Sequence, residues 1–195
     1  MNKKIGIYGG SFNPIHRGHT SLAKAILAKG LVDELWLMVS PLNPLKCGRE
    51  GEMADYGHRL SMAEIAAGGV EGLRVSDFES RMPVPSYMYN TLQALGKEYG
   101  GNEFVLVIGA DNWRDFNRWY RAEDIVREFG VLVYRRPGCE IDEGGMPEGV
   151  RVVDTELYDI SSTQIREALK RGECVGKWLD NGVEEYIREK GVYVW

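Results

Sequence analysis

One segment lies between an expected strand and an expected helix, and it reads Gly9-Gly10-Ser11-Phe12-Asn13-Pro14-Ile15-His16-Arg17-Gly18-His19. The apolar run Lys4–Tyr8 before it predicts a β-strand. The stretch of about Gly18–Lys29 after it predicts a helix, because its apolar residues share one face and Gly30 stands where a left-handed C-cap is expected. A strand that turns through glycines into a helix is the first unit of a parallel sheet with crossover helices. The segment therefore predicts an α/β fold.

The same alternation continues along the chain. We expect further strands at Glu34–Val39, Leu73–Ser76, Glu103–Gly109, Gly130–Tyr134 and Val150–Val153. Helices are expected at about Tyr56–Ala67, Ser86–Tyr99 with Ser86 as N-cap, Ala110–Trp113, Arg121–Glu128, Ser161–Arg171 with a capping box, and Val183–Arg188. Prolines and glycines predict loops at Ser40–Gly51 and Arg136–Gly149. No repeat or composition break divides the chain, so we expect one domain over residues 1–195, with about 160–195 as a C-terminal helical subregion.

Length and composition exclude several classes of protein. The chain has 195 residues, of which 44% are hydrophobic and 27% charged, which excludes a disordered or fibrous chain. Its apolar runs are shorter than the roughly 18 residues of a membrane span, and no signal-peptide h-region is present, so we expect a cytoplasmic protein. The net charge is 24 − 29 = −5 without a basic stripe, so nucleic acid is not an expected partner. The three cysteines are odd in number, widely spaced and without a C-x-x-C pair, so we expect them to be free thiols.

The first segment also carries the main chemical signal. It holds two of the three histidines, and with Arg17 they place potential cations at the positive end of a helix, where only a bound polyanion would favour them. The alternative is an ordinary turn with one buried and one exposed histidine. A protein-bound metal is not indicated, because neither His58 nor any cysteine supplies a third ligand at a suitable spacing. The segment matches neither a P-loop nor a dinucleotide fingerprint.

Three further places are candidates for binding. The helix start at Ser161–Arg166 offers hydroxyls, N–H groups and one cation to a phosphate, or it is only a capped helix with a surface arginine. Asp111 follows the most apolar strand and could accept hydrogen bonds from a ribose or amide, or simply cap the next helix. The aromatic stretch from Trp113 to Tyr120 is core packing by default, although one exposed ring could stack on a flat ligand. Lys46 is a solvated lysine unless its loop folds over the site.

These residues resemble a known family. The first segment is similar to the G-x-F-x-P-x-H-x-G-H signature of the nucleotidylyltransferase superfamily, and Ile160–Arg166 is similar to its I-S-S-T-x-I-R motif. Four segments resemble the bacterial nicotinate-nucleotide adenylyltransferases within that superfamily. They are Phe12–His16, Ser40–Lys46, Gly109–Asn112 and Trp119-Tyr120. The resemblance spans nearly the whole chain.

The resemblance implies a Rossmann-like fold, namely an open, mostly parallel sheet with helices on both faces and a small C-terminal helical part. It implies a reaction that joins ATP and nicotinate mononucleotide to give deamido-NAD and pyrophosphate, by direct in-line attack on the α-phosphate. Mg²⁺ would be held by phosphates and water, with no metal site of protein ligands. The implied catalytic residues are His16, His19 and Arg166. The implied ATP-binding residues are Gly9, Gly10, Ser11, Phe12, His16, His19, Ser162, Thr163 and Arg166. The implied nicotinate-mononucleotide-binding residues are Asn43, Lys46, Tyr87, Asp111, Trp119 and Tyr120, with Trp119 stacking on the ring.

Two departures from the family pattern bear on specificity. Met88 stands where the family has a threonine and Asn90 where it has an acid, so backbone N–H groups are the expected donors to the nicotinate carboxylate. The alternatives are nicotinamide mononucleotide as substrate, adenylyl transfer to phosphopantetheine, cytidylyl transfer to a phosphorylated alcohol, and a non-catalytic nucleotide sensor. The phosphopantetheine and cytidylyl enzymes usually carry an aspartate where this chain has Asn13. We expect a monomer or homo-oligomer.

Overall fold

The computed structural model describes residues 2–41, 53–156, 158–180 and 182–193. Six parallel strands form one sheet in the order β3-β2-β1-β4-β5-β6. They are β1 (Lys4–Gly10), β2 (Glu34–Val39), β3 (Leu73–Ser76), β4 (Glu103–Gly109), β5 (Val131–Tyr134) and β6 (Val150–Val153). The strand order reverses between β1 and β4, and in open α/β sheets a ligand binds in the crevice at such a point.

The helices confirm the expected alternation with small shifts in their ends. They are α1 (Arg17–Ala28), α2 (Tyr56–Ala67), α3 (Met88–Glu98), α4 (Ala110–Arg114), α5 (Ala122–Glu128), α6 (Ser162–Lys170) and α7 (Val183–Lys190). The capping box of Ser161 and Gln164 is present at α6, and Gly30 has a φ of 62° after α1. One expectation was wrong: α3 begins at Met88 with Tyr87 as N-cap, because the Ser86 hydroxyl hydrogen-bonds to Glu79 instead.

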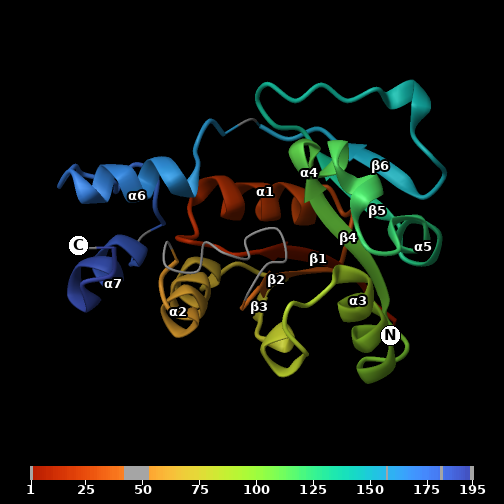
Figure 1. Ribbon diagram of the computed structural model, residues 1–195, viewed down its shortest axis with the longest axis horizontal. Helices are drawn as coiled ribbons and strands as arrows, with labels where there is room; N and C mark the ends of the chain where they lie inside the picture. Colours follow the sequence, from red (N-terminus) through yellow and green to blue (C-terminus); the bar gives the residue numbers. More distant parts are fainter. Residues whose placement is uncertain (1, 42–52, 157, 181, 194–195) are drawn as a thin grey trace.

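Apolar side chains on alternate strand positions form two cores, one on each face of the sheet. Leu35 and Leu37 of β2 lie in the cluster that holds the buried faces of α1, α2, α6 and α7. Trp36 and Met38 lie in the cluster that holds α3 and α5. The sheet is therefore covered on both faces, which confirms the expected Rossmann-like class. Figure 1 shows α6 and α7 together at one end of the molecule, next to α1 and α2.

A buried arginine joins the loops at the carboxyl edge of the sheet. Arg59 is 1% exposed, and its guanidinium donates to the backbone carbonyls of Ser11, Ser40, Pro41 and Ala54 at 2.7–3.0 Å. These bonds satisfy a charge that would be costly to bury alone. Arg59 thereby holds the segment after β1 against the end of β2. Within the described residues, no helix has both the length and the apolar character of a membrane crossing.

Candidate active site

The loop between β1 and α1 packs an aromatic ring under the first motif. Phe12 is 3% exposed and has a φ of 45°, in the left-handed region that side chains other than glycine rarely adopt. A Cβ on Gly10 would lie 2.9 Å from the Phe12 ring, so Gly10 makes room for this ring. The ring meets the imidazole of His19 edge-on, with 5.1 Å between centroids. The glycines of the motif thus serve a close packing arrangement that holds His19.

His16 and His19 lie side by side at the start of α1. His16 is the N-cap of α1 and His19 is the third residue of the helix, and their rings are stacked with centroids 3.7 Å apart. The backbone N–H of His16 donates to Nδ1 of His19 at 3.2 Å. Because Nδ1 accepts a hydrogen bond, the ring proton of neutral His19 sits on Nε2. His19 can therefore donate from Nε2 to an anionic oxygen.

His16 is not the cation that its position suggested. Its side chain is buried, and burial together with the nearby positive charge of Arg136 lowers its pKa from 6.5 to about 3. It is neutral at physiological pH, so one of the three potential cations at this helix start carries no charge. The His16 side chain faces the start of α1, where it forms a capping box with the backbone N–H of His19.

The second motif is bonded directly to the first. The Ser162 hydroxyl donates to the carbonyl oxygen of Pro14 at 2.9 Å, and Nη1 of Arg166 donates to the carbonyl oxygen of Asn13 at 2.9 Å. The N-terminus of α6 therefore lies against the loop that precedes α1, although about 150 residues separate them. The two helix starts that the sequence singled out form one site, as a ligand with several phosphates would require.

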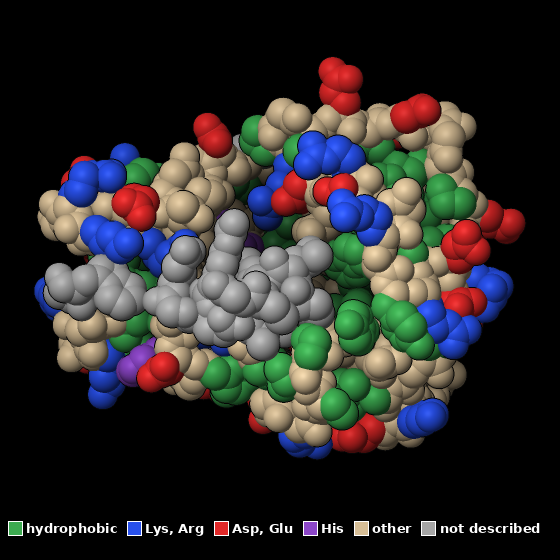
Figure 2. All heavy atoms as spheres, in the orientation of Figure 1, with side chains coloured by type: hydrophobic (Ala, Val, Ile, Leu, Met, Phe, Trp, Pro, Cys, Tyr) green, Lys and Arg blue, Asp and Glu red, His purple; other side chains and the backbone are tan. Residues whose placement is uncertain are grey.

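A cleft of about 320 Å³ runs along this edge of the sheet. It brings together most of the residues predicted to bind ATP, and two of those predicted for the pyridine nucleotide, namely Gly9, Gly10, Ser11, Phe12, His16, His19, Ser162, Thr163, Asp111 and Trp119. Arg166 does not line the cleft itself, but it is hydrogen-bonded to Asn13, which does. Figure 2 shows a hollow near the centre of this face, bordered on one side by blue Lys and Arg side chains and on another by green hydrophobic ones.

The sequence reasoning missed a polar cluster in this cleft. Nε of Arg136 lies 3.4 Å from Oδ1 of Asp111, and Nη2 of Arg136 donates to the Tyr134 hydroxyl at 3.1 Å. The Tyr134 hydroxyl in turn lies 3.1 Å from that of Tyr8. Asp111 does not cap α4, whose N-cap is Gly109. The rule that singled out Asp111, a polar residue just past the carboxyl end of a strand, would also have found Arg136 beyond β5.

A second cavity of about 150 Å³ lies beside the cleft and collects the aromatic side chains predicted for the pyridine nucleotide. Tyr87, Trp119 and Tyr120 line it, and the sequence reasoning did not include its other polar lining residues Glu79, Ser86 and Arg118. Trp119 lies over the buried Phe116, with 5.3 Å between rings, whereas Tyr120 is 52% exposed. Within the aromatic stretch, Phe116 thus belongs to the core, whereas Trp119 and Tyr120 line the pocket. Trp119 also lines the cleft, so the two cavities adjoin.

Two polar side chains of this second cavity carry information about its ligand. The indole Nε1 of Trp119 is buried without a hydrogen-bond partner in the described residues, and it can donate to a ligand. Burial raises the pKa of Glu79, while hydroxyl donors from Thr91, Ser40 and Ser86 oppose the rise. Met88 lines both cavities, and its methyl group would lie 2.8 Å from a Cβ on Gly9. A side chain at position 88 therefore separates the two cavities.

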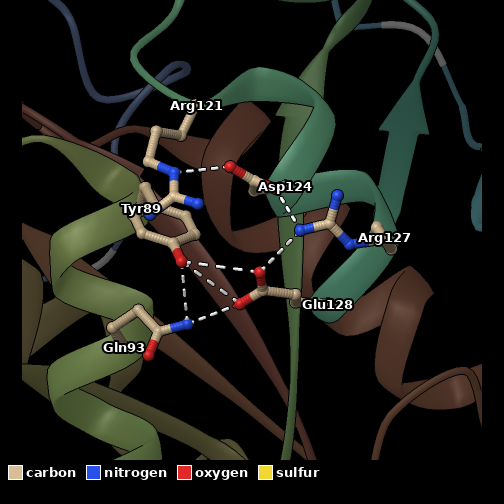
Figure 3. Close-up of polar contacts among 6 residues, drawn as sticks. All are labelled: Tyr89, Gln93, Arg121, Asp124, Arg127 and Glu128. Carbon is tan, nitrogen blue, oxygen red and sulfur yellow. Dashed lines mark hydrogen bonds and ion pairs between the residues drawn. The ribbon is translucent and has the colours of Figure 1, made fainter.

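A polar network supports the aromatic wall from behind. Arg121, which follows Tyr120, packs its guanidinium over the Tyr89 ring at 4.4 Å and donates to Asp124 at 2.5 Å. Tyr89, at the start of α3, donates to Glu128 of α5, and Arg127 pairs with both acids (Figure 3). The network joins α5 to α3, whose first residue lines the second cavity.

Some predicted features cannot be placed. Asn43 and Lys46 lie outside the described residues. Among the residues that are described, no group of three or more histidine, cysteine, aspartate or glutamate side chains is arranged to hold a metal ion. Cys139 and Cys174 are free thiols, and Cys47 also falls outside the described residues.

A glycine-rich turn and two helix starts at the carboxyl edge of a doubly wound parallel sheet define a nucleotide-binding α/β protein. Residues 7–168 match the model of the cytidylyltransferase-like family. A protein of Bacteroides thetaiotaomicron named "Probable nicotinate-nucleotide adenylyltransferase" is 46% identical over 186 residues, which are 95% of this chain and 91% of the relative. A protein of the same name from Christiangramia forsetii is 36% identical, over 99% of this chain and 100% of its own. The chain belongs to the nicotinate-nucleotide adenylyltransferases of the cytidylyltransferase-like family.

The fold has a close counterpart among solved structures. The Plasmodium falciparum nicotinic acid mononucleotide adenylyltransferase, solved with NaAD, superimposes with a TM-score of 0.82. The match covers 98% of each chain at 22% identity, so it supports the fold of this chain independently of close sequence similarity.

Proposed function

We propose that this protein joins ATP to nicotinate mononucleotide, and so forms deamido-NAD and pyrophosphate as a step of NAD biosynthesis. The observation that carries the proposal is the pairing of two adjoining cavities, one beneath both phosphate motifs and one walled by Trp119, Tyr120 and Tyr87. The first suits a polyphosphate and the second a flat ring. Membership of the adenylyltransferase family agrees with this reading.

The reaction needs no covalent enzyme intermediate. A phosphate oxygen of nicotinate mononucleotide forms a bond to the α-phosphorus of ATP, and the bond from that phosphorus to the bridging oxygen breaks as pyrophosphate leaves. The nucleophile is already an anion at neutral pH, so a strong general base is unnecessary. Catalysis then comes from holding the two substrates in line and from stabilising the charge that shifts to the leaving group.

We assign the phosphate contacts by position. Nε2 of His19 donates to the α-phosphate, because His16 occupies the other nitrogen of its ring through the backbone. Arg166, with its fixed positive charge, contacts the β- and γ-phosphates. His16 belongs on the same side, but as a neutral group, since its pKa is about 3. It contributes a directed hydrogen bond rather than a charge.

The nucleoside of ATP has a candidate pocket next to these groups. A cavity of about 220 Å³ beyond His19 is lined by Gly18, Leu22, Tyr158 and Ile160, which suit a flat base. Arg136 and Tyr134 line both this cavity and the main cleft. We assign Asp111 to a ribose hydroxyl, and Arg136 to fixing the Asp111 carboxylate and adding positive charge at the junction of the cavities.

The described residues of the main cleft offer few ligands for the Mg²⁺ ion that would accompany ATP. Asp111 is the sole carboxylate lining the described part of the main cleft, and it is already paired with Arg136. An Mg²⁺ ion would therefore be held mainly by phosphate oxygens and water, and it would supply positive charge to the polyphosphate.

The N-terminus of α3 is the proposed site of the nicotinate carboxylate. α3 runs from Met88 to Glu98, and its first residue lines the second cavity. The unpaired N–H groups and the dipole of a helix start favour an anion. This arrangement recognises the carboxylate without the hydroxyl that Met88 replaces.

The test is pyrophosphate release from Mg-ATP with nicotinate mononucleotide, nicotinamide mononucleotide or phosphopantetheine offered in parallel. We expect fast release with the nicotinate form. Release only with the amide form would overturn the assignment of the carboxylate site. Release only with phosphopantetheine, or no release with any of the three acceptors, would overturn the proposed function and leave the fold assignment in place.

A further inference from the structure

The phenol of Tyr193 is bonded to the phosphate loop from the far end of the chain. Its hydroxyl donates to Oδ1 of Asn13 at 2.6 Å, and both residues are buried, Tyr193 at 3% and Asn13 at 4% exposure. Asn13 stands three residues before His16, in the loop that lines the main cleft. Tyr193 lies beyond residues 7–168, which match the family model, and it lines none of the three cavities of the site.

Asn13 is the point at which separate parts of the fold meet this loop. Its Oδ1 also accepts a hydrogen bond from the backbone N–H of Ala54 at 3.0 Å, and its carbonyl oxygen accepts one from Arg166 at 2.9 Å. With two donors converging on Oδ1, the side-chain amide of Asn13 is held in a single orientation. Loss of the Tyr193 donor would remove one of the bonds that hold that orientation.

The charges around the phenol add to this coupling. The hydroxyl of Tyr193 lies near the guanidinium groups of Arg166 and Arg59, which act to lower its pKa, although burial raises that pKa well above its usual value. Arg59 bonds to the same loop at the carbonyl oxygen of Ser11. The charges of Arg166 and Arg59 thus act on the phenol, and both residues bond to the loop. Tyr193 remains a neutral donor at physiological pH.

The backbone at Tyr193 indicates that this placement is enforced. Its φ is 65°, in the left-handed region, which is uncommon for a bulky side chain and persists where the surroundings determine it. The preceding Val192 is buried, and its N–H donates to Ile187 of α7 at 3.0 Å. α7 and its C-cap therefore direct the Tyr193 side chain inward to the loop.

We propose that Tyr193 is a positioning residue for ATP: through Asn13 it fixes the loop that carries His16 and the carbonyl group that orients Arg166. The inference rests on the proposed function for its kinetic consequence. It concerns the ATP side of the site alone, since the second cavity contains neither Asn13 nor Arg166.

Tyr193→Phe removes the hydroxyl and keeps the ring. We expect kcat/KM for ATP to fall about fivefold to tenfold, as for the loss of one buried hydrogen bond, with the KM for nicotinate mononucleotide unchanged. The binding of Mg-ATP, measured by calorimetry in the absence of the second substrate, should weaken by a similar factor. This binding measurement keeps the inference testable even if the wild-type protein releases no pyrophosphate, an outcome that would overturn the proposed function alone.

The matched control is Tyr186→Phe. Tyr186 lies on α7 and shares a hydrogen bond of 2.9 Å with Nδ1 of His58 on α2, away from the cleft. Both variants lose one phenol hydrogen bond, and both melting temperatures should fall by a few degrees. Only the Tyr193 variant should lose affinity for ATP. Equal ATP kinetics and binding in the two variants would reduce Tyr193 to a stability role and overturn the inference.

A second set of variants tests whether the effect passes through Asn13. In an Asn13→Asp background, which keeps the acceptor oxygen, Tyr193→Phe should carry the same penalty. In an Asn13→Ala background it should carry almost none, because the bonded partner is already gone. Additive losses in the alanine background would show that Tyr193 acts by another route.

Discussion

The backbone N–H of His16 points at Nδ1 of His19 from 3.2 Å, and this bond determines which nitrogen of His19 faces a ligand. The proton of the neutral ring must then reside on Nε2, where it can serve the α-phosphate. The arrangement gives the two histidines different tasks: the backbone of one orients the ring of the other.

His19→Ala should lower kcat by about 10²–10³, because it removes a donor that stabilises charge in the transition state. The third histidine supplies the control, since His58 bonds to Tyr186 on the far side of α2. His58→Ala should leave turnover within about twofold of the wild-type value. Initial rates of pyrophosphate release at saturating substrates measure both, and near-normal turnover of His19→Ala would contradict the assignment.

The buried, neutral state of His16 predicts a pH dependence of stability. Its pKa is about 3 in the folded protein against 6.5 for the unperturbed side chain, so the unfolded chain binds the proton first as the pH falls. Its contribution is fully present above pH 6.5 and is lost on acidification, at up to about 1.4 kcal/mol per pH unit. From pH 7 to pH 5, urea unfolding should show a loss about 2 kcal/mol larger for the wild-type than for His16→Asn. Parallel curves would show that His16 titrates normally.

Arg136→Gln should lower kcat/KM for ATP by about 10- to 100-fold, because the residue places a fixed charge where the cleft meets the proposed nucleoside pocket. Arg171 is a control, as its side chain pairs with Glu173 at the surface and lines none of the three cavities of the site. Arg171→Gln should change kcat/KM by less than about twofold. If the two glutamine variants behave alike in steady-state kinetics, Arg136 has no role in the site.

Trp119→Ala should raise the KM for nicotinate mononucleotide at least about tenfold while the KM for ATP changes little, because the indole would stack on the pyridine ring. Trp113 stacks on Phe116 and lines neither the main cleft nor the second cavity. Trp113→Phe should therefore leave both KM values near those of the wild-type. Equal effects on the two substrates would place Trp119 in the scaffold rather than in the ring site.

The elements of this fold could be predicted because their signals are local. The strand at Glu34–Val39 is a continuous apolar run, and the helix at Tyr56–Ala67 is bounded by turn residues, so their ends agree with the structure. Ser86 shows where a local rule fails: it precedes a helix and resembles a cap, but its hydroxyl is used by the buried Glu79 from another segment. Tertiary contacts of this kind leave no trace in the neighbouring sequence.

The residues of the candidate site also differ in how far the sequence alone predicts them. Gly9 to His19 and Ser161 to Arg166 could be singled out because each is a short motif with its own chemistry at a helix start. Their contact through Ser162 and Pro14 is a property of the folded chain. Arg136 lay within reach of the strand-end rule, whereas Tyr193 had no sequence signal, since its role depends on a partner 180 residues away.

The bond between Tyr193 and Asn13 also has a consequence for biosynthesis of the protein. During translation the phosphate loop is synthesised early, and the phenol that orients it follows 180 residues after Asn13. A nascent chain that already contains both nucleotide motifs, α6 included, would still hold Asn13 by fewer bonds than the finished protein. On this inference, full affinity for ATP is acquired only after Tyr193 has been synthesised and its hydroxyl has bonded to Asn13.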